Sequence, residues 1–356
     1  MKPPQPPPTL ATHKAPTGIS GFDAIAGGGL PRGRTTLLVG GPGSGKTVFA
    51  LQFLVHGVQH CKEPGVFVAW EETSPCIMAN ADSFGWNITP AQRKKLFFLD
   101  AQPQSDLIQS GDFDLCGMLA GLEAQALATG ARRIVFDALD ILLALLPDAA
   151  AQRREIYRLH AWLLSRELTA IITLKADTDD THTISQQPFG FMQFMVDCAV
   201  ILNHGVLLGV SQRSLRVQKY RGSSFDENES PFLIGNSGFE IAGARTLDSV
   251  DTQVTTERVS SGVERLDTML GGGYYRGASV LVTGFSGTAK TTLSGAFVQA
   301  ACQRGERTLF VSFDSEGGEV IRNLASVGIR LERYVKNGVL RMASARTITG
   351  SAETYL

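Results

Sequence analysis

The residues best suited to chemistry form an octet at positions 40–47, which reads GGPGSGKT. An apolar run at 36–39 precedes it, and a helix-like run at 48–54 follows. In this order of strand, glycine-rich loop and helix, backbone N–H groups point at phosphates, the lysine reaches the β- and γ-phosphates, and the hydroxyl holds Mg²⁺. We therefore expect ATP to be bound by Gly43, Ser44, Gly45, Lys46, Thr47 and Val48, with Thr47 also a ligand of Mg²⁺.

A second octet of the same kind, GFSGTAKT, occupies positions 284–291. The spacing between Lys46 and Lys290 equals that between Gly18 and Gly262, so the register is held well beyond the loops. Such a repeat indicates a duplicated domain. Ala289 replaces the last glycine of the loop, and alanine is small and suits helical backbone angles, so we expect it to let the backbone approach phosphates. The second set of nucleotide-binding residues is then Gly287, Thr288, Ala289, Lys290, Thr291 and Thr292, with Thr291 on Mg²⁺.

Acidic residues end two of the apolar runs. Asp137 follows the run at 132–136 and suits the Walker B position, where a carboxylate orients Mg²⁺; the alternative is an aspartate that caps the next helix. Glu71 and Glu72 follow the run at 65–70, at the ligand edge of a doubly wound sheet. Neighbouring strand residues point in opposite directions, so one carboxylate can act on water near the γ-phosphate. Two solvated acids at a strand end are an equal alternative.

A basic turn, KYRGSS, lies at positions 219–224, far from the first octet. In ring-shaped NTPases, a Lys/Arg pair of this kind can reach across a subunit boundary and stabilise charge on the γ-phosphate. Taken alone, the segment is an ordinary basic β-turn.

Apolar runs alternate with helix-like segments along the first repeat, which predicts an α/β fold with a mostly parallel sheet and helices on both faces. We expect strands at 65–70, 96–99, 132–137, 170–174, 196–202 and 215–220, the last two in an antiparallel arrangement, and helices at 77–84, 115–129 and 153–168. The predicted organisation is a disordered Pro-rich tail at 1–14, a first domain at 15–245, a linker at 246–257 and part of a second domain at 258–356.

Composition narrows the class of protein. The chain has 356 residues, of which 43% are hydrophobic and 19% charged, and its net charge is −1. The near-neutral charge argues against a nucleic-acid-binding surface. The five cysteines form no CxxC pair, and no apolar run reaches the roughly 18 residues of a membrane span. With no apolar signal segment near Met1, we expect a cytoplasmic protein.

These features resemble the KaiC family of RecA-like P-loop ATPases, the hexameric circadian-clock proteins and their relatives. The resemblance covers residues 16–356 and rests on TGISGFDAIAGGGLPRGR before the first octet, EET at 71–73, NADSFGW at 80–86, RREIYRL at 153–159 and KYRGSSF at 219–225. It implies a nucleotide-dependent homohexamer, possible regulatory partners of the KaiB type, and no membrane or nucleic acid. It also assigns Glu71 and Glu72 as catalytic carboxylates, Lys219 and Arg221 as catalytic groups acting on the neighbour's ATP, and nucleotide contacts to Ser83, Lys219, Tyr220, Arg221 and Ser223.

The second repeat departs from this pattern. Asp314 and Ser315 stand where the first repeat has its two glutamates, and the sequence ends after a strand-like segment at 339–342, before any Walker B strand. We therefore expect a truncated domain that binds ATP without efficient hydrolysis, lacks the family's autokinase sites, and exposes apolar surface. The predicted function is a slow regulatory ATPase whose full-length parent is a Ser/Thr autokinase. The alternatives are a RecA/RadA-like DNA-dependent ATPase and a non-catalytic nucleotide-binding scaffold.

Overall fold

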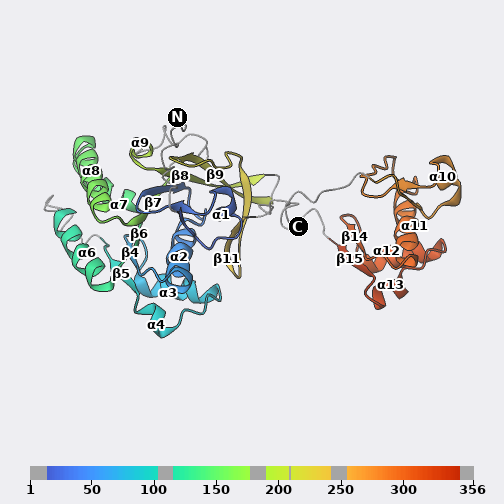
Figure 1. The fold of residues 1–356 in the computed structure, drawn as a ribbon, viewed down its shortest axis with the longest axis horizontal. Coiled ribbons are helices and arrows are strands. Elements are labelled where there is room, and N and C mark those ends of the chain that lie inside the picture. The colour runs from blue at the N-terminus through green and yellow to red at the C-terminus, as the bar shows by residue number, and fades with distance from the viewer. Residues whose placement is uncertain (1–13, 103–114, 177–189, 208–209, 242–254, 345–356) are drawn as a thin grey trace, which may run out of the picture. The chain divides into compact units, whose positions relative to one another are not determined.

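The computed structural model describes residues 14–102, 115–176, 190–207, 210–241 and 255–344. They form two compact units, one of residues up to 241 and the other of residues from 255 onward (Figure 1). Positions 1–13 of the predicted tail and 246–254 of the predicted linker lie outside the described residues. Lys14, which we had placed in the tail, belongs to a short strand, β1.

A nine-stranded sheet organises the first unit, in the order β11-β10-β9-β8-β3-β7-β6-β4-β5. The strands from β8 to β5 run parallel, and β9, β10 and β11 continue the sheet antiparallel. The strand bounds are β3 Thr35–Gly40, β4 Gly65–Ala69, β5 Leu96–Asp100, β6 Arg133–Asp137, β7 Thr169–Lys175, β8 Cys198–Leu207, β9 Val210–Tyr220, β10 Ser230–Gly235 and β11 Gly238–Ile241. Beside the sheet, β1 Lys14–Ala15 pairs with β2 Leu30–Pro31.

Helices cover both faces of this sheet, as the alternating pattern predicted. Successive residues of β3 enter different cores: Leu38 packs with α1, α2 and α3, whereas Leu37 and Val39 pack with α6, α7 and α8. Both faces of the strand are thus buried, which explains why its sequence is continuously apolar. The helix bounds are α1 Phe22–Ile25, α2 Lys46–His56, α3 Ser74–Ser83, α4 Pro90–Arg93, α6 Leu115–Thr129, α7 Leu139–Ala144, α8 Ala149–Ser165 and α9 Met192–Met195.

Side-chain caps moved some boundaries away from their predicted positions. α8 begins at Ala149, before the expected residue 153, because the Asp148 side chain accepts a hydrogen bond from the backbone N–H of Ala151 at 2.7 Å and caps the helix. α6 matches its predicted bounds and is followed by Gly130 at φ 67°, a left-handed residue that ends a helix.

The second unit repeats the first part of this architecture. Its elements are β12 Arg258–Val259, α10 Glu264–Met269, β13 Tyr274–Tyr275, α11 Lys290–Gln303, β14 Thr308–Ser312, α12 Gly317–Ser326, α13 Glu332–Lys336 and β15 Leu340–Ser344. β14 and β15 pair in parallel, as β4 and β5 do. Local detail is repeated too: the Asp23 carboxylate accepts from the backbone N–H of Thr17 at 3.0 Å, and Asp267 accepts from that of Ser261 at 2.7 Å.

Apolar side chains of the second unit are exposed, as expected for part of a sheet. The segment before the second octet forms no strand, because the described residues of this unit include no counterpart of β7 and β8, the two strands that flank β3. Leu281 is 87% and Phe285 89% exposed. The other exposed apolar residues here include Val280, Val282, Leu309, Val311 and Phe313.

Candidate nucleotide site of the first unit

The first octet forms a tight loop between β3 and α2. Gly45 adopts φ 91° and ψ 18°, a left-handed conformation that turns the chain into the helix. A Cβ at this position would lie 2.5 Å from Cδ1 of Ile234 on β10, the movable end of a side chain, so it is mainly the positive φ that favours glycine here. The Lys46 ammonium donates to the carbonyl oxygens of Gly40 and Gly41 at 2.7 and 2.9 Å, which holds it over the loop.

A hydrogen bond joins this loop to the predicted Walker B aspartate. The Thr47 hydroxyl donates to Oδ2 of Asp137 at 2.9 Å, and Thr173 of the intervening strand β7 donates to Oδ1 at 2.7 Å. Burial raises the pKa of Asp137, against the opposing effect of these two hydrogen bonds and of the Lys46 charge. Two of the three predicted metal ligands, Thr47 and Asp137, therefore touch each other.

The two adjacent glutamates have different surroundings. Glu71 lies close enough to the loop for its charge to act on both Lys46 and Asp137. Glu72 instead accepts a hydrogen bond from the Asn80 side chain of α3 at 3.2 Å. The predicted alternation of strand side chains does not explain this divergence, because β4 ends at Ala69 and both glutamates lie in the bend that follows. Burial lowers the pKa of Lys46, while the nearby carboxylates, Glu71 among them, act to raise it.

Three nearby residues were missed by the sequence analysis. Asp140 on α7 contributes a further negative charge near Lys46, and its carboxylate accepts from the backbone N–H of Lys175 at 3.2 Å. Its signal was the DALD tetrapeptide that starts at the Walker B position. Thr173 and His204 carried no signal. His204 Nδ1 lies 3.6 Å from where a Cβ of Gly43 would be, next to the loop.

The site fits magnesium and a triphosphate in its donor chemistry. Mg²⁺ prefers oxygen ligands, and a hydroxyl and a carboxylate oxygen stand together at Thr47 and Asp137. Gly45 has no side chain to cover the backbone of the loop, so a ligand can approach it. At Gly41, no atom lies within 4 Å of the place that a Cβ would take. Among the described residues, no group of three His, Cys, Asp or Glu side chains forms a metal site, so remaining ligands would come from phosphate and water.

The basic turn binds backbone groups of its own chain. The Lys219 ammonium donates to the carbonyl oxygens of Gln193 and Val196 at 2.5 and 2.7 Å, and Arg221 donates to that of Phe194 at 2.8 Å. These oxygens lie in and just after α9, where a helix end favours positive charge. Burial, with a smaller contribution from the Arg221 charge, lowers the pKa of Lys219.

Three other residues predicted to contact nucleotide make their hydrogen bonds to groups outside the first loop. The Tyr220 phenol points into the domain: it is buried, donates to the carbonyl of Gly29 at 2.8 Å, and has its pKa raised by burial, so it packs rather than facing a ligand. Ser223 is part-exposed, and its hydroxyl donates to the carbonyl of Ser224. Ser83 ends α3 and donates to the carbonyl of Asn80.

The second octet reproduces the shape of the first. Lys290 donates to the carbonyl oxygens of Gly284 and Phe285, both at 2.8 Å, as Lys46 does to Gly40 and Gly41. Thr288 closes the loop with a 2.8 Å bond to Phe285, and Thr291 and Thr292 lie in the first turn of α11. The expectation that Ala289 takes helical angles was wrong: it lies at φ 62° and ψ 24°, left-handed like Gly45, which is strained for a residue with a Cβ.

Comparison with known families agrees with this geometry. The family model described as "ATPase: KaiC" matches residues 15–246 and 259–354. The chain belongs to the KaiC family. It is 38% identical over 98% of its length to the circadian clock protein KaiC2 of Synechocystis, and 37% identical over 96% to the circadian clock oscillator protein KaiC of Parathermosynechococcus lividus. The chain spans 61% and 63% of the length of these two relatives.

KaiC membership confirms the predicted RecA-like P-loop fold, and it does not favour the DNA-dependent alternative or the non-catalytic scaffold. The strand order agrees: β7 lies between the loop strand β3 and the Walker B strand β6, and it supplies Thr173 to Asp137. In the part of the chain that the structure describes, no helix is long and apolar enough to cross a bilayer.

Proposed function

We propose that the first unit binds Mg²⁺ and ATP and hydrolyses the β–γ phosphoanhydride bond slowly. The observation that carries this proposal is the 2.9 Å hydrogen bond between Thr47 and Asp137. Glu71 lies near enough for its charge to act on Asp137. It brings a loop residue and a strand residue, distant in sequence, to one point with the oxygen donors that Mg²⁺ prefers.

Each group of the site has a role in this proposal. Lys46 and the loop amides bind the phosphates, and Thr47 and Asp137 hold Mg²⁺, which neutralises developing charge. Glu71 accepts a proton from the water that attacks the γ-phosphorus, and ADP leaves with the bridging oxygen. Glu72, which contacts Asn80 and not the loop, has no direct part in this step.

The finer features of the family complete the proposal. The chain assembles as a nucleotide-dependent homohexamer in the cytoplasm, the second octet binds nucleotide without efficient turnover, and the parent protein is a Ser/Thr autokinase with regulatory partners of the KaiB type. Lys219 and Arg221 act on the neighbour's ATP, with Ser83 and Ser223 near the nucleotide. Because both basic side chains hold α9 carbonyls, they must leave these partners to reach across a boundary.

Phosphate release by the purified chain tests the activity, with and without Mg²⁺ and with and without single-stranded DNA. Turnover should require Mg²⁺, ignore DNA, disappear in Lys46→Ala, and persist in the matched Lys290→Ala variant. Turnover of Lys46→Ala equal to that of the unmodified chain would refute the assignment to the first unit.

Light scattering behind size exclusion tests the assembly, and mixed rings test the basic turn. Rings mixed from Arg221→Ala and Glu71→Gln subunits should regain activity if Arg221 acts on the neighbour, because some interfaces then pair an intact carboxylate with an intact arginine. Mixtures with no more activity than the two separate variants would exclude action across the boundary.

A further inference from the structure

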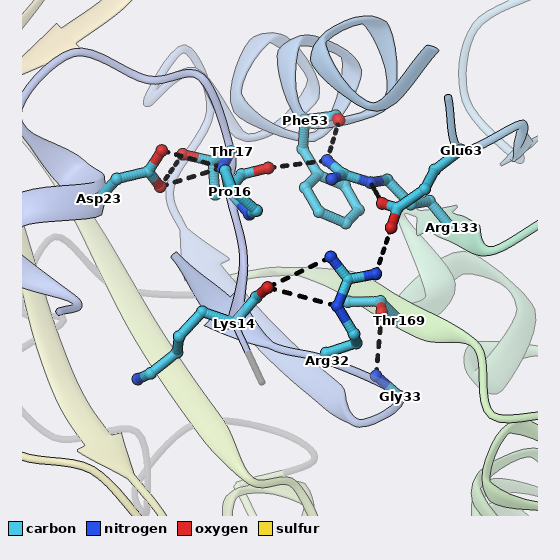
Figure 2. A network of polar contacts seen from close by, with 10 residues as sticks. All are labelled: Lys14, Pro16, Thr17, Asp23, Arg32, Gly33, Phe53, Glu63, Arg133 and Thr169. Atoms are coloured by element: carbon cyan, nitrogen blue, oxygen red, sulfur yellow. Dashed lines mark hydrogen bonds and ion pairs between the residues drawn. The ribbon is translucent and has the colours of Figure 1, made fainter. Parts of the chain in front are cut away.

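Arg133, the first residue of β6, is a fully buried cation at the opposite end of that strand from Asp137. Figure 2 shows its guanidinium among three segments of the chain: Nη1 donates to the carbonyl oxygens of Pro16 and Phe53, both at 2.8 Å, and Nε donates to the Glu63 carboxylate at 2.6 Å. The guanidinium carbon also lies 4.4 Å from the centre of the Phe53 ring. Sequence analysis assigned no role to this residue.

β6 and α2 are therefore joined at two places. At one end of β6, Asp137 accepts from Thr47 in the first turn of α2; at the other end, Arg133 binds the carbonyl of Phe53, further along the same helix. Two joints between the same strand and helix fix how far the helix can slide along the strand. The second joint thus constrains the first, which contains the proposed metal ligands.

The helix is adapted to this contact. α2 ends at His56 and continues as a π-helical turn over Gly57–Cys61, a local widening that often accompanies a functional constraint. A Cβ at Gly57 would lie 2.6 Å from both Cδ and Nε of Arg133, so the glycine admits the arginine. Glu63, just beyond the turn, also binds Arg32, which in turn donates to the carbonyl of Lys14 (Figure 2).

The joint is poorly suited to stability alone. Nη2 of Arg133 is buried and makes no hydrogen bond to the described residues, and a buried ion pair with an unmet donor is weak evidence for net stabilisation. An apolar residue of similar size would remove the unmet donor, but it would also take a donor from Pro16, Phe53 and Glu63. What an arginine adds over an apolar side chain is a set of directed hydrogen bonds, which fixes the geometry of the segments around it.

We propose that Arg133 is a positioning residue, which holds α2 in register on β6 and so keeps Thr47 and Asp137 together as ligands of Mg²⁺. This inference rests on the proposed nucleotide site. Groups that orient metal ligands without touching the metal commonly contribute about 10–100-fold to metal affinity. We therefore expect the loss of Arg133 to weaken Mg²⁺ binding while the loop amides and Lys46 still bind phosphates.

The test measures binding of a fluorescent ADP analogue to the full chain, first without Mg²⁺ and then through an Mg²⁺ titration. Without Mg²⁺, Arg133→Met should bind the analogue with an affinity within about 2-fold of that of the unmodified chain. Its midpoint in the Mg²⁺ titration should be higher by about 10-fold or more, the lower end of the contribution that such groups make to metal affinity. Arg133→Lys keeps the charge and should recover part of the loss. If Arg133→Met does not fold, Glu63→Gln, which removes one partner of the guanidinium, should shift the midpoint in the same direction by a smaller factor.

Two matched variants separate positioning from general effects. Arg132→Met removes an exposed charge from the neighbouring position, and Leu163→Ala destabilises the other face of the sheet. Both should keep the Mg²⁺ midpoint of the unmodified chain. An unshifted midpoint in Arg133→Met, an equal shift in Leu163→Ala, or no effect of Mg²⁺ on the unmodified chain would each overturn the inference. If the unmodified chain binds nucleotide in a Mg²⁺-dependent way but does not turn it over, only the proposed hydrolysis is refuted. The positioning role of Arg133 is then still decided by the Mg²⁺ midpoints of the variants.

Discussion

Replacing Glu71 and Glu72 one at a time by glutamine separates two carboxylates that are adjacent in sequence and differ in surroundings. Both side chains are exposed, but the charge of Glu71 acts on Lys46 and Asp137, whereas Glu72 accepts a hydrogen bond from Asn80. Glutamine preserves the size of each side chain and removes only its charge and its ability to accept a proton.

The expected effects differ by orders of magnitude. A positioned general base contributes about 10²–10⁴-fold to a rate, and each tenfold is about 1.4 kcal/mol, so Glu71→Gln should raise the activation free energy by about 3–5 kcal/mol. Glu72→Gln keeps an oxygen that can accept from Asn80, and it should change turnover less than about 3-fold because Glu72 contacts Asn80 and not the phosphate-binding loop. The double variant should match Glu71→Gln to within about 3-fold, because Glu72 has no part in the chemical step.

Single-turnover phosphate release gives the chemical step, and fluorescent-nucleotide binding provides the control. Both single variants should bind nucleotide almost as the unmodified chain does, because Lys46 and the loop amides supply the binding. A larger loss of turnover in Glu72→Gln than in Glu71→Gln would refute the reasoning from the surroundings of the two side chains. Equal, small losses in both would show that neither is the base.

Three further predictions concern the folded state. Ala289→Gly should stabilise the second unit by about 0.5–1 kcal/mol because it relieves a left-handed alanine. Gly45→Ala should destabilise the first unit by about 1–3 kcal/mol through the positive φ and the contact with Ile234. Denaturant unfolding measures both changes, and the opposite signs would show that the loop angles were misjudged. Burial alone would raise the pKa of Glu63, but the hydrogen bonds and charges of its two arginines lower it. The unmodified chain should therefore be more stable than Glu63→Gln above the ordinary Glu pKa, about 4.3. This difference in the free energy of unfolding should vanish as the pH falls through the lower pKa of the folded state. Burial raises the pKa of Asp137, so the charge of this carboxylate destabilises the Mg²⁺-free fold at neutral pH. Asp137→Asn should therefore raise the midpoint of thermal unfolding at neutral pH, and added Mg²⁺ should no longer change that midpoint.

Local patterns in the sequence were sufficient for the loop, its flanking strand and helix, and the duplication. Glycine, lysine and threonine at fixed spacing carry the phosphate-binding geometry within a few consecutive residues, so no long-range contact is needed to recognise it. The same holds for the buried strands, whose unbroken apolar runs predict helices on both faces. Helix ends were less certain, because a single cap such as Asp148 moves a boundary by several residues.

Tertiary structure alone decided which side chains meet. Thr173 completes the pairing of Asp137 from another strand, and Arg133 reaches Phe53 and Glu63 across the fold; nothing in their spacing predicts these contacts. It also set the different surroundings of Glu71 and Glu72, which lie in the bend after β4. The physical reason is that sequence patterns encode periodicity and local turns, whereas the charge, burial and partners of a group depend on strands brought together by the sheet order.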